Sequence, residues 1–112
     1  MKQIVLALLG ATVLSSIASA QSSQLERARF LLRVGYPEPA LAILETLPET
    51  PAVIEGRARA HIMIASQIEP AGRCDHLRRA VDLGSMSSSQ NLVEFARRRL
   101  QEEGCAATRP QM

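Results

Sequence analysis

Apolar residues recur every three or four positions in five successive segments of this chain, and glycine or proline residues separate the segments. This spacing places apolar side chains on one face of an α-helix, and no segment shows the strict alternation of a half-buried strand. Aromatic residues, which favour strands, are limited to one Tyr and two Phe in 112 residues. We therefore expect an all-α fold in which short connections pair neighbouring helices as antiparallel hairpins.

Capping residues mark the ends of these five helices. Three helices open on N-capping signals: Ser23 with Glu26, Thr50 with Pro51, and Ser87 with Gln90. Three helices end at glycines suited to a left-handed C-cap: Gly35, Gly84 and Gly104. The second helix opens near Pro37 and ends before Pro48. These signals predict helices over residues 23–34, 37–47, 51–68, 74–83 and 88–103.

Residues 1–20 have the pattern of a cleaved secretory signal peptide. Lys2 precedes an apolar run from Ile4 to Leu14, and the segment closes on small residues up to Ala20. The apolar run is shorter than the ~20 residues that a membrane-spanning helix needs. We therefore expect cleavage near Ala20, a periplasmic or secreted product, a helical domain over residues 21–105 and a flexible tail over residues 106–112.

Two cysteines, Cys74 and Cys105, fall in the exported part of the chain. In an oxidising compartment an even pair is more often bridged than free. Because an antiparallel hairpin brings the start of its first helix close to the end of its second, the two cysteines should lie at the same end of the last hairpin. We expect a disulfide; the alternative is two buried free thiols.

The stretch from Ala28 to Pro48 resembles a tetratricopeptide repeat. Ala28 and Ala40 match the small positions of the two repeat helices, Gly35 matches the turn, and Leu44 and Leu47 match later packing positions. A second unit follows at a spacing of 36 residues instead of the family's 34. The resemblance implies about two repeats and a C-terminal capping helix over roughly residues 23–104; the alternative is a generic five-helix bundle.

The resemblance also implies a binding surface. In this family the first helix of each repeat lines a concave groove that takes an extended peptide or a partner helix, and such proteins act as scaffolds. The matching positions predict the following groove residues: Leu25, Arg29, Leu32, Arg33 and Arg59, with Arg57 as a weaker candidate.

Arginine forks beside leucines suit an acidic segment or a C-terminal carboxylate, because guanidinium groups hold carboxylates bidentately. The alternative is that these arginines form a solvated face paired with nearby glutamates: Glu26, Glu38 and Glu55.

The sequence gives little indication of a metal site. Cys74, Asp75 and His76, with His61 and Cys105, are the densest set of potential metal ligands, but helical residues two apart point away from each other and export favours the disulfide. We expect His61 to be packed and hydrogen-bonded.

The chain has no phosphate-binding loop, nucleophile elbow or metalloprotease motif, and its net charge of +2 is too balanced for a dedicated nucleic-acid binder. We expect a non-enzymatic exported adaptor without metal or cofactor that binds another exported or envelope protein. The alternatives are a disulfide-bonded helical bundle with a structural or inhibitory role, or a metal-binding protein.

Overall fold

The structure, a computed structural model, describes the backbone of residues 2–105 and the side chains of residues 17–105. The expected tail, residues 106–112, lies outside this range. Five helices account for most of the chain: α1 (Lys2–Arg33), α2 (Pro37–Leu44), α3 (Pro51–Gln67), α4 (Pro70–Met86) and α5 (Gln90–Glu102). Residues 2–105 contain no strand, so the all-α expectation is confirmed for this range.

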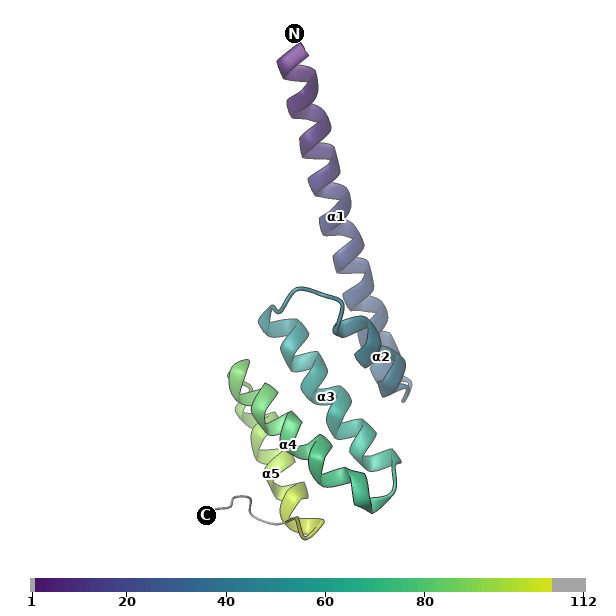
Figure 1. Ribbon diagram of the computed structural model, residues 1–112, viewed down its shortest axis with the longest axis vertical. Helices are drawn as coiled ribbons and strands as arrows, with labels where there is room; N and C mark the ends of the chain where they lie inside the picture. Colours follow the sequence, from purple (N-terminus) through teal and green to yellow (C-terminus); the bar gives the residue numbers. More distant parts are fainter. Residues whose placement is uncertain (1, 106–112) are drawn as a thin grey trace.

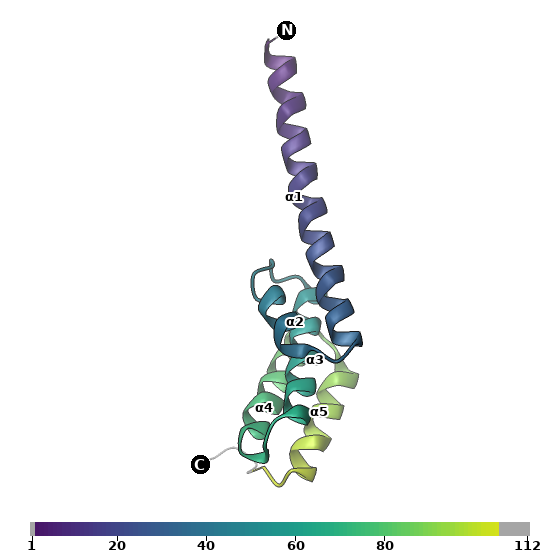
Figure 2. The same ribbon diagram turned by 90° about the vertical axis from the view of Figure 1, so that its right-hand side faces the viewer.

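Each helix packs against the next in sequence, and α3 also contacts α1 and α5. As a result, α3 lies between the α1–α2 hairpin and the α4–α5 hairpin (Figures 1 and 2). No helix in the described range is both long and apolar enough to cross a membrane.

Helix α1 begins well before the position that the capping box predicts. It runs unbroken from Lys2, so Ser23 lies inside the helix and does not act as an N-cap, and the prediction is wrong for the uncleaved chain. The physical reason is that a preceding turn of helix supplies carbonyl acceptors for the N–H groups that a cap would otherwise satisfy. Residues 17–24 are all exposed, and Leu25 is the first residue that packs against the core.

The first core surrounds Leu44, the last residue of α2. Leu44 is fully buried and lies over Gly56 of α3, where an added Cβ would come within 3.2 Å of both Leu44 methyl carbons. Four buried residues complete this core: Ala28, Ala40, Leu47 and Val53. Glycine at position 56 therefore allows α2 and α3 to approach closely.

Arg57, the neighbour of Gly56, holds the end of α2. Its Nε and Nη2 atoms donate to the carbonyl oxygen of Leu44 at 3.2 and 3.0 Å, and Nη2 also donates to the carbonyl of Leu47 at 3.3 Å. Its Nη1 atom forms an ion pair with Glu49 at 3.0 Å. One side chain thus satisfies carbonyls at the end of α2 that have no partner within that helix.

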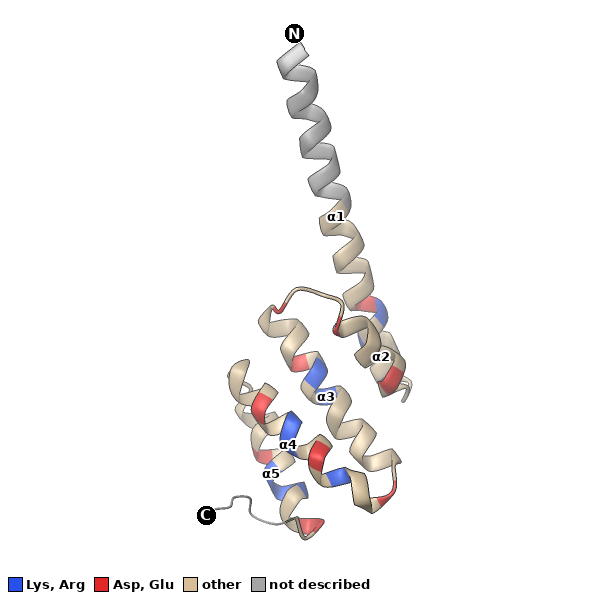
Figure 3. Cartoon of the chain, viewed as in Figure 1, with Lys and Arg blue, Asp and Glu red and all other residues tan. Residues whose placement is uncertain are grey.

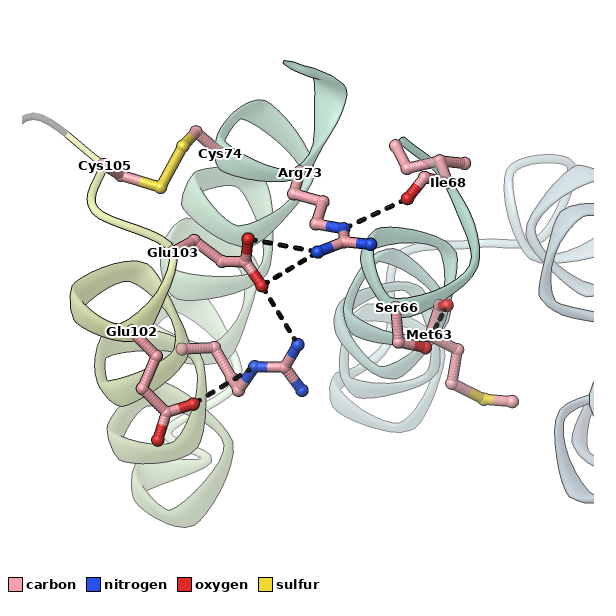
Figure 4. A network of polar contacts seen from close by, with 9 residues as sticks. Met63, Ser66, Ile68, Arg73, Cys74, Glu102, Glu103 and Cys105 are labelled. Carbon is pink, nitrogen blue, oxygen red and sulfur yellow. Dashed lines mark hydrogen bonds and ion pairs between the residues drawn. A yellow bond between two sulfur atoms is a disulfide. The ribbon is translucent and has the colours of Figure 1, made fainter. Parts of the chain in front are cut away.

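The expected disulfide joins Cys74, near the start of α4, to Cys105, just after α5, with their Cα atoms 5.8 Å apart. Beside it, Nη1 of Arg73 donates to both carboxylate oxygens of Glu103 at 3.2 Å, and Arg99 reaches the same carboxylate at 3.4 Å (Figure 4). The end of α5 is therefore fixed to the start of α4 by a covalent bond and by charged hydrogen bonds.

The turn between α4 and α5 departs from the prediction. Helix α4 continues past Gly84, and Ser88 adopts the left-handed conformation with a φ of 59°. Ser88 and Ser89 donate backbone hydrogen bonds to the carbonyls of Ser85 and Gly84 at 3.2 and 2.8 Å, the pattern of a Schellman motif. Gly84 serves packing instead, because an added Cβ there would lie 2.9 Å from a methyl carbon of Val93.

The predicted N-cap of the last helix is also wrong, whereas other capping predictions are confirmed. Ser89, not Ser87, is the N-cap of α5, and its side chain contacts the Ser87 hydroxyl at 2.8 Å instead of capping the helix. Thr50 caps α3 by accepting a hydrogen bond from the Val53 N–H at 3.3 Å. Two predicted helix-ending glycines have positive φ angles: Gly35 and Gly104.

The packing role of Gly84 and the positive φ of Ser88 predict opposite responses to substitution. Gly84→Ala should lower the free energy of unfolding by about 1–3 kcal/mol, because the new methyl group collides with Val93. Ser88→Gly should raise it by about 1 kcal/mol, because glycine adopts a positive φ without steric cost. Urea denaturation of both variants with the disulfide intact measures the two changes. If Gly84→Ala were stabilising, as at an unobstructed helix position, the close packing of α4 on α5 would be refuted.

Candidate functional site

A groove of about 1110 Å³ lies between α1, α3 and the start of α5. Its lining residues come from α1, from α3, from the turn before α5 and from α5, and no lining residue lies in α2 or α4. They are Arg29, Leu32, Arg33, Ala52, Glu55, Gly56, Arg59, Ile62, Met63, Ser88, Ser89, Gln90, Asn91, Leu92 and Phe95.

Helical spacing explains why these side chains face the same groove. Arg29, Leu32 and Arg33 are three and four residues apart and therefore share one face of α1. On α5, Leu92 and Phe95 have the same relation. Neighbouring positions on the three helices supply core residues that are completely or almost completely buried: Ala28 in α1, Ala58 in α3, and Val93 and Ala96 in α5.

Four of the five predicted groove residues line this groove: Arg29, Leu32, Arg33 and Arg59. Leu25 does not, because it lies one helical turn earlier and packs against the core around Leu44. The weaker candidate, Arg57, points away from the groove and binds the carbonyls at the end of α2. The structure shows that four of the predicted residues line the groove, whereas their role in binding stays a prediction.

The prediction missed the wall formed by α5. Phe95 lines the groove and keeps 39% of its surface exposed, and the Arg98 guanidinium lies 5.8 Å from the centre of its ring. The sequence signal for this wall was Phe95, a large aromatic residue that does not belong to the apolar stripe of its own helix.

The groove contains more positive than negative charge, with three arginines and one glutamate among its lining residues. Arg59 pairs with Glu55 at 3.0 Å and Arg29 pairs with Glu26 at 3.3 Å, as the alternative interpretation expects for these two arginines. Arg33 forms no ion pair within the described residues, and its guanidinium lies 5.9 Å from the Phe30 ring centre. Elsewhere, both signs of charge are interspersed along α3, α4 and α5 (Figure 3).

A histidine pair lies between α3 and α4, apart from the groove. The Nδ1 atoms of His61 and His76 are 2.8 Å apart, so one ring must donate a hydrogen bond and the other must accept it. His61 is only 5% exposed, and the expectation that it is packed and hydrogen-bonded is confirmed. Burial, followed by the charges of His76 and Arg79, lowers the pKa of His61 to about 4.

The potential metal ligands do not converge. Cys74 and Cys105 are joined in the disulfide and therefore have no thiolate to offer a metal ion. Among the residues that the structure describes, no three His, Cys, Asp or Glu side chains are grouped to hold an ion.

Comparison with protein-family models, curated proteins and solved structures found no match to this chain.

The lowered pKa of His61 predicts a loss of stability in acid. Between pH 6.5 and about 4, an unfolded His61 binds a proton that the folded His61 does not, so the free energy of unfolding rises with pH across this window. The accumulated loss on acidification should be roughly 3 kcal/mol.

Urea denaturation at several pH values from 7 to 4 measures this effect. His61→Gln is the matched control, because glutamine can still exchange a hydrogen bond with His76 but does not titrate. The variant should lose less stability over this window than the parent protein. Equal losses in the two proteins would show that His61 is not responsible.

Proposed function

We propose that this protein is an exported helical adaptor that binds a segment of another exported or envelope protein in the groove between α1, α3 and α5. The observation that carries the proposal is the composition of the groove, where leucine, isoleucine and phenylalanine side chains lie beside three arginines. Apolar area supplies binding free energy, and the arginines supply specificity for charge.

The proposal includes a repeat architecture of the tetratricopeptide type. The hairpins α1–α2 and α3–α4 would be two repeats and α5 the capping helix, so that the first helix of each unit faces the groove. Several of the matched positions are buried: Ala28, Ala40, Leu44 and Leu47 in the first unit, and Leu77 and Ala80 in the second. The matched residues Leu41 and Leu83 are only partly buried.

The partner segment proposed here carries carboxylates next to apolar side chains. Arg33 has no carboxylate partner among the described residues and can form a bidentate pair with one. The pairs of Arg29 with Glu26 and of Arg59 with Glu55 are exposed and therefore worth no more than about 1 kcal/mol each. A bound carboxylate can replace either glutamate at little cost.

Export of the protein has two kinds of structural support. Residues 17–24 are exposed, so the residues on both sides of the expected cleavage point after Ala20 lie outside the core around Leu44. A disulfide between Cys74 and Cys105 suits an oxidising compartment, which agrees with a periplasmic or secreted location.

A second candidate function is that of a disulfide-bonded bundle with a structural or inhibitory role, acting through another surface. Three large apolar side chains near the end of α1 favour it: Phe30, Val34 and Tyr36 are each about half exposed or more. These residues do not line the groove.

Charge reversal distinguishes the two candidates. Arg29→Glu combined with Arg33→Glu should weaken partner binding at least tenfold, because each substitution removes a charged hydrogen-bond donor and adds repulsion. The matched control combines Arg27→Glu with Arg97→Glu, since both arginines are exposed and neither lines the groove. In-cell crosslinking identifies the partner, and titration of the purified pair measures its dissociation constant.

Circular dichroism must first show that both double variants are folded. Binding lost only in the groove variant supports the adaptor. Equal binding by the parent and the groove variant would refute the groove as the binding site and favour a surface away from Arg29 and Arg33.

A further inference from the structure

The exported protein should begin a few residues before its first packed side chain. Residues 17–24 are exposed, and Leu25 is the first residue that contacts the core. Cleavage after Ala20 therefore leaves four unpacked residues at the new N-terminus, of which Gln21 is the first.

We propose that Gln21 is a modification site, and that the exported protein carries pyroglutamate at its N-terminus. The inference goes beyond the adaptor function; it rests on the proposed export and is independent of the groove. In the uncleaved chain, the Gln21 nitrogen is an amide bonded to Ala20 within α1 and is not nucleophilic. Cleavage converts this nitrogen into a primary α-amine, so Gln21 then carries both an amine and a side-chain carboxamide.

The reaction needs no other reactant. The α-amino nitrogen attacks the carboxamide carbon Cδ, a new C–N bond closes a five-membered lactam, and the bond from Cδ to Nε2 breaks. Nε2 leaves as ammonia, and its third hydrogen comes from the attacking amine. No electron is gained or lost, and the uncharged form of the amine is well populated near neutral pH because an α-amino group has a pKa of about 7.7–8.0.

The surroundings of Gln21 leave the reaction unobstructed. Its side chain is exposed. A terminal helical turn without packed contacts frays easily, so Gln21 can fold its side chain back onto its own amine at little cost. A residue held in the core, such as Ala28, would not have this freedom.

Cyclisation also favours the helix that follows. A free α-ammonium would place a positive charge at the new start of α1, where the helix dipole is already positive. The lactam is neutral and removes this repulsion. It also blocks aminopeptidases, which need a free α-amino group, from the unpacked residues before Leu25.

Intact-mass and N-terminal tandem mass spectrometry of the exported protein test the proposal. We expect a chain that starts at residue 21 with a mass lower by one ammonia, and that resists an aminopeptidase. A synthetic peptide of residues 21–30 with a free amine is carried through the same handling, and the protein must be substantially more cyclised than this peptide. The matched variant Gln21→Ser should keep its amine and be trimmed by the aminopeptidase.

Each other result overturns the proposal in a distinguishable way. An uncyclised Gln21 at the N-terminus, or cyclisation no greater than in the peptide, would refute the modification and leave export intact. An exported chain that starts at another residue would refute the cleavage site. A protein that keeps residues 1–20 would refute the proposed export itself.

Discussion

The contact of Leu44 with Gly56 positions the first half of the molecule. Helix α2 has only eight residues, too few for a helix to be stable by itself in water. Its last residue, Leu44, is accommodated because Gly56 has no side chain, and Arg57 binds the carbonyls beyond it. Because α1 packs on α2 as well as on α3, this contact also determines where α1 lies. The groove wall that contains Arg29, Leu32 and Arg33 therefore depends on a residue without a side chain.

The second half of the molecule is held differently. Besides larger residues such as Ile64, Leu77 and Val93, the buried residues of α3, α4 and α5 include five alanines that are fully buried or nearly so: Ala58, Ala60, Ala65, Ala80 and Ala96. Small side chains allow close helix packing, but each buries little apolar area. The disulfide and the hydrogen bonds around Glu103 compensate for this modest core at the end of α5. The α5 wall of the groove lies at the other end of that helix, where Val93 packs on Gly84.

The sequence was sufficient to predict features that depend on local pattern. Helical periodicity predicted the five helices, two glycines predicted helix ends, and the compartment together with hairpin geometry predicted the bond between Cys74 and Cys105. The errors arose where a local pattern competes with packing or with neighbouring turns. Gly84 was interpreted as a helix end, but the fold uses its missing side chain to admit Val93.

The groove was predicted only in part, because a local pattern places residues on one face of a helix but does not show which distant residues they meet. The spacing of Arg29, Leu32 and Arg33 was sufficient to place them on one face of a helix. The destination of the Arg57 side chain was not predictable, because its partners are carbonyls thirteen and ten positions earlier in the chain. The contribution of α5 depends on how the last hairpin is positioned against α3, a tertiary relation that no segment of sequence contains by itself.

The position of the disulfide gives the two hairpins unequal resistance to mechanical force. A pull between the two ends of the chain passes through α1, α2 and α3 and then through the bond between Cys74 and Cys105. The 31-residue interval closed by that bond holds most of α4 and all of α5, and it is bypassed by the force. An extended chain gains about 3.3–3.6 Å per residue, so roughly 100 Å of length stays stored while the bond is intact. Under load the first hairpin and α3 would be drawn out, whereas α5 and its part of the groove would remain covalently tethered to α4.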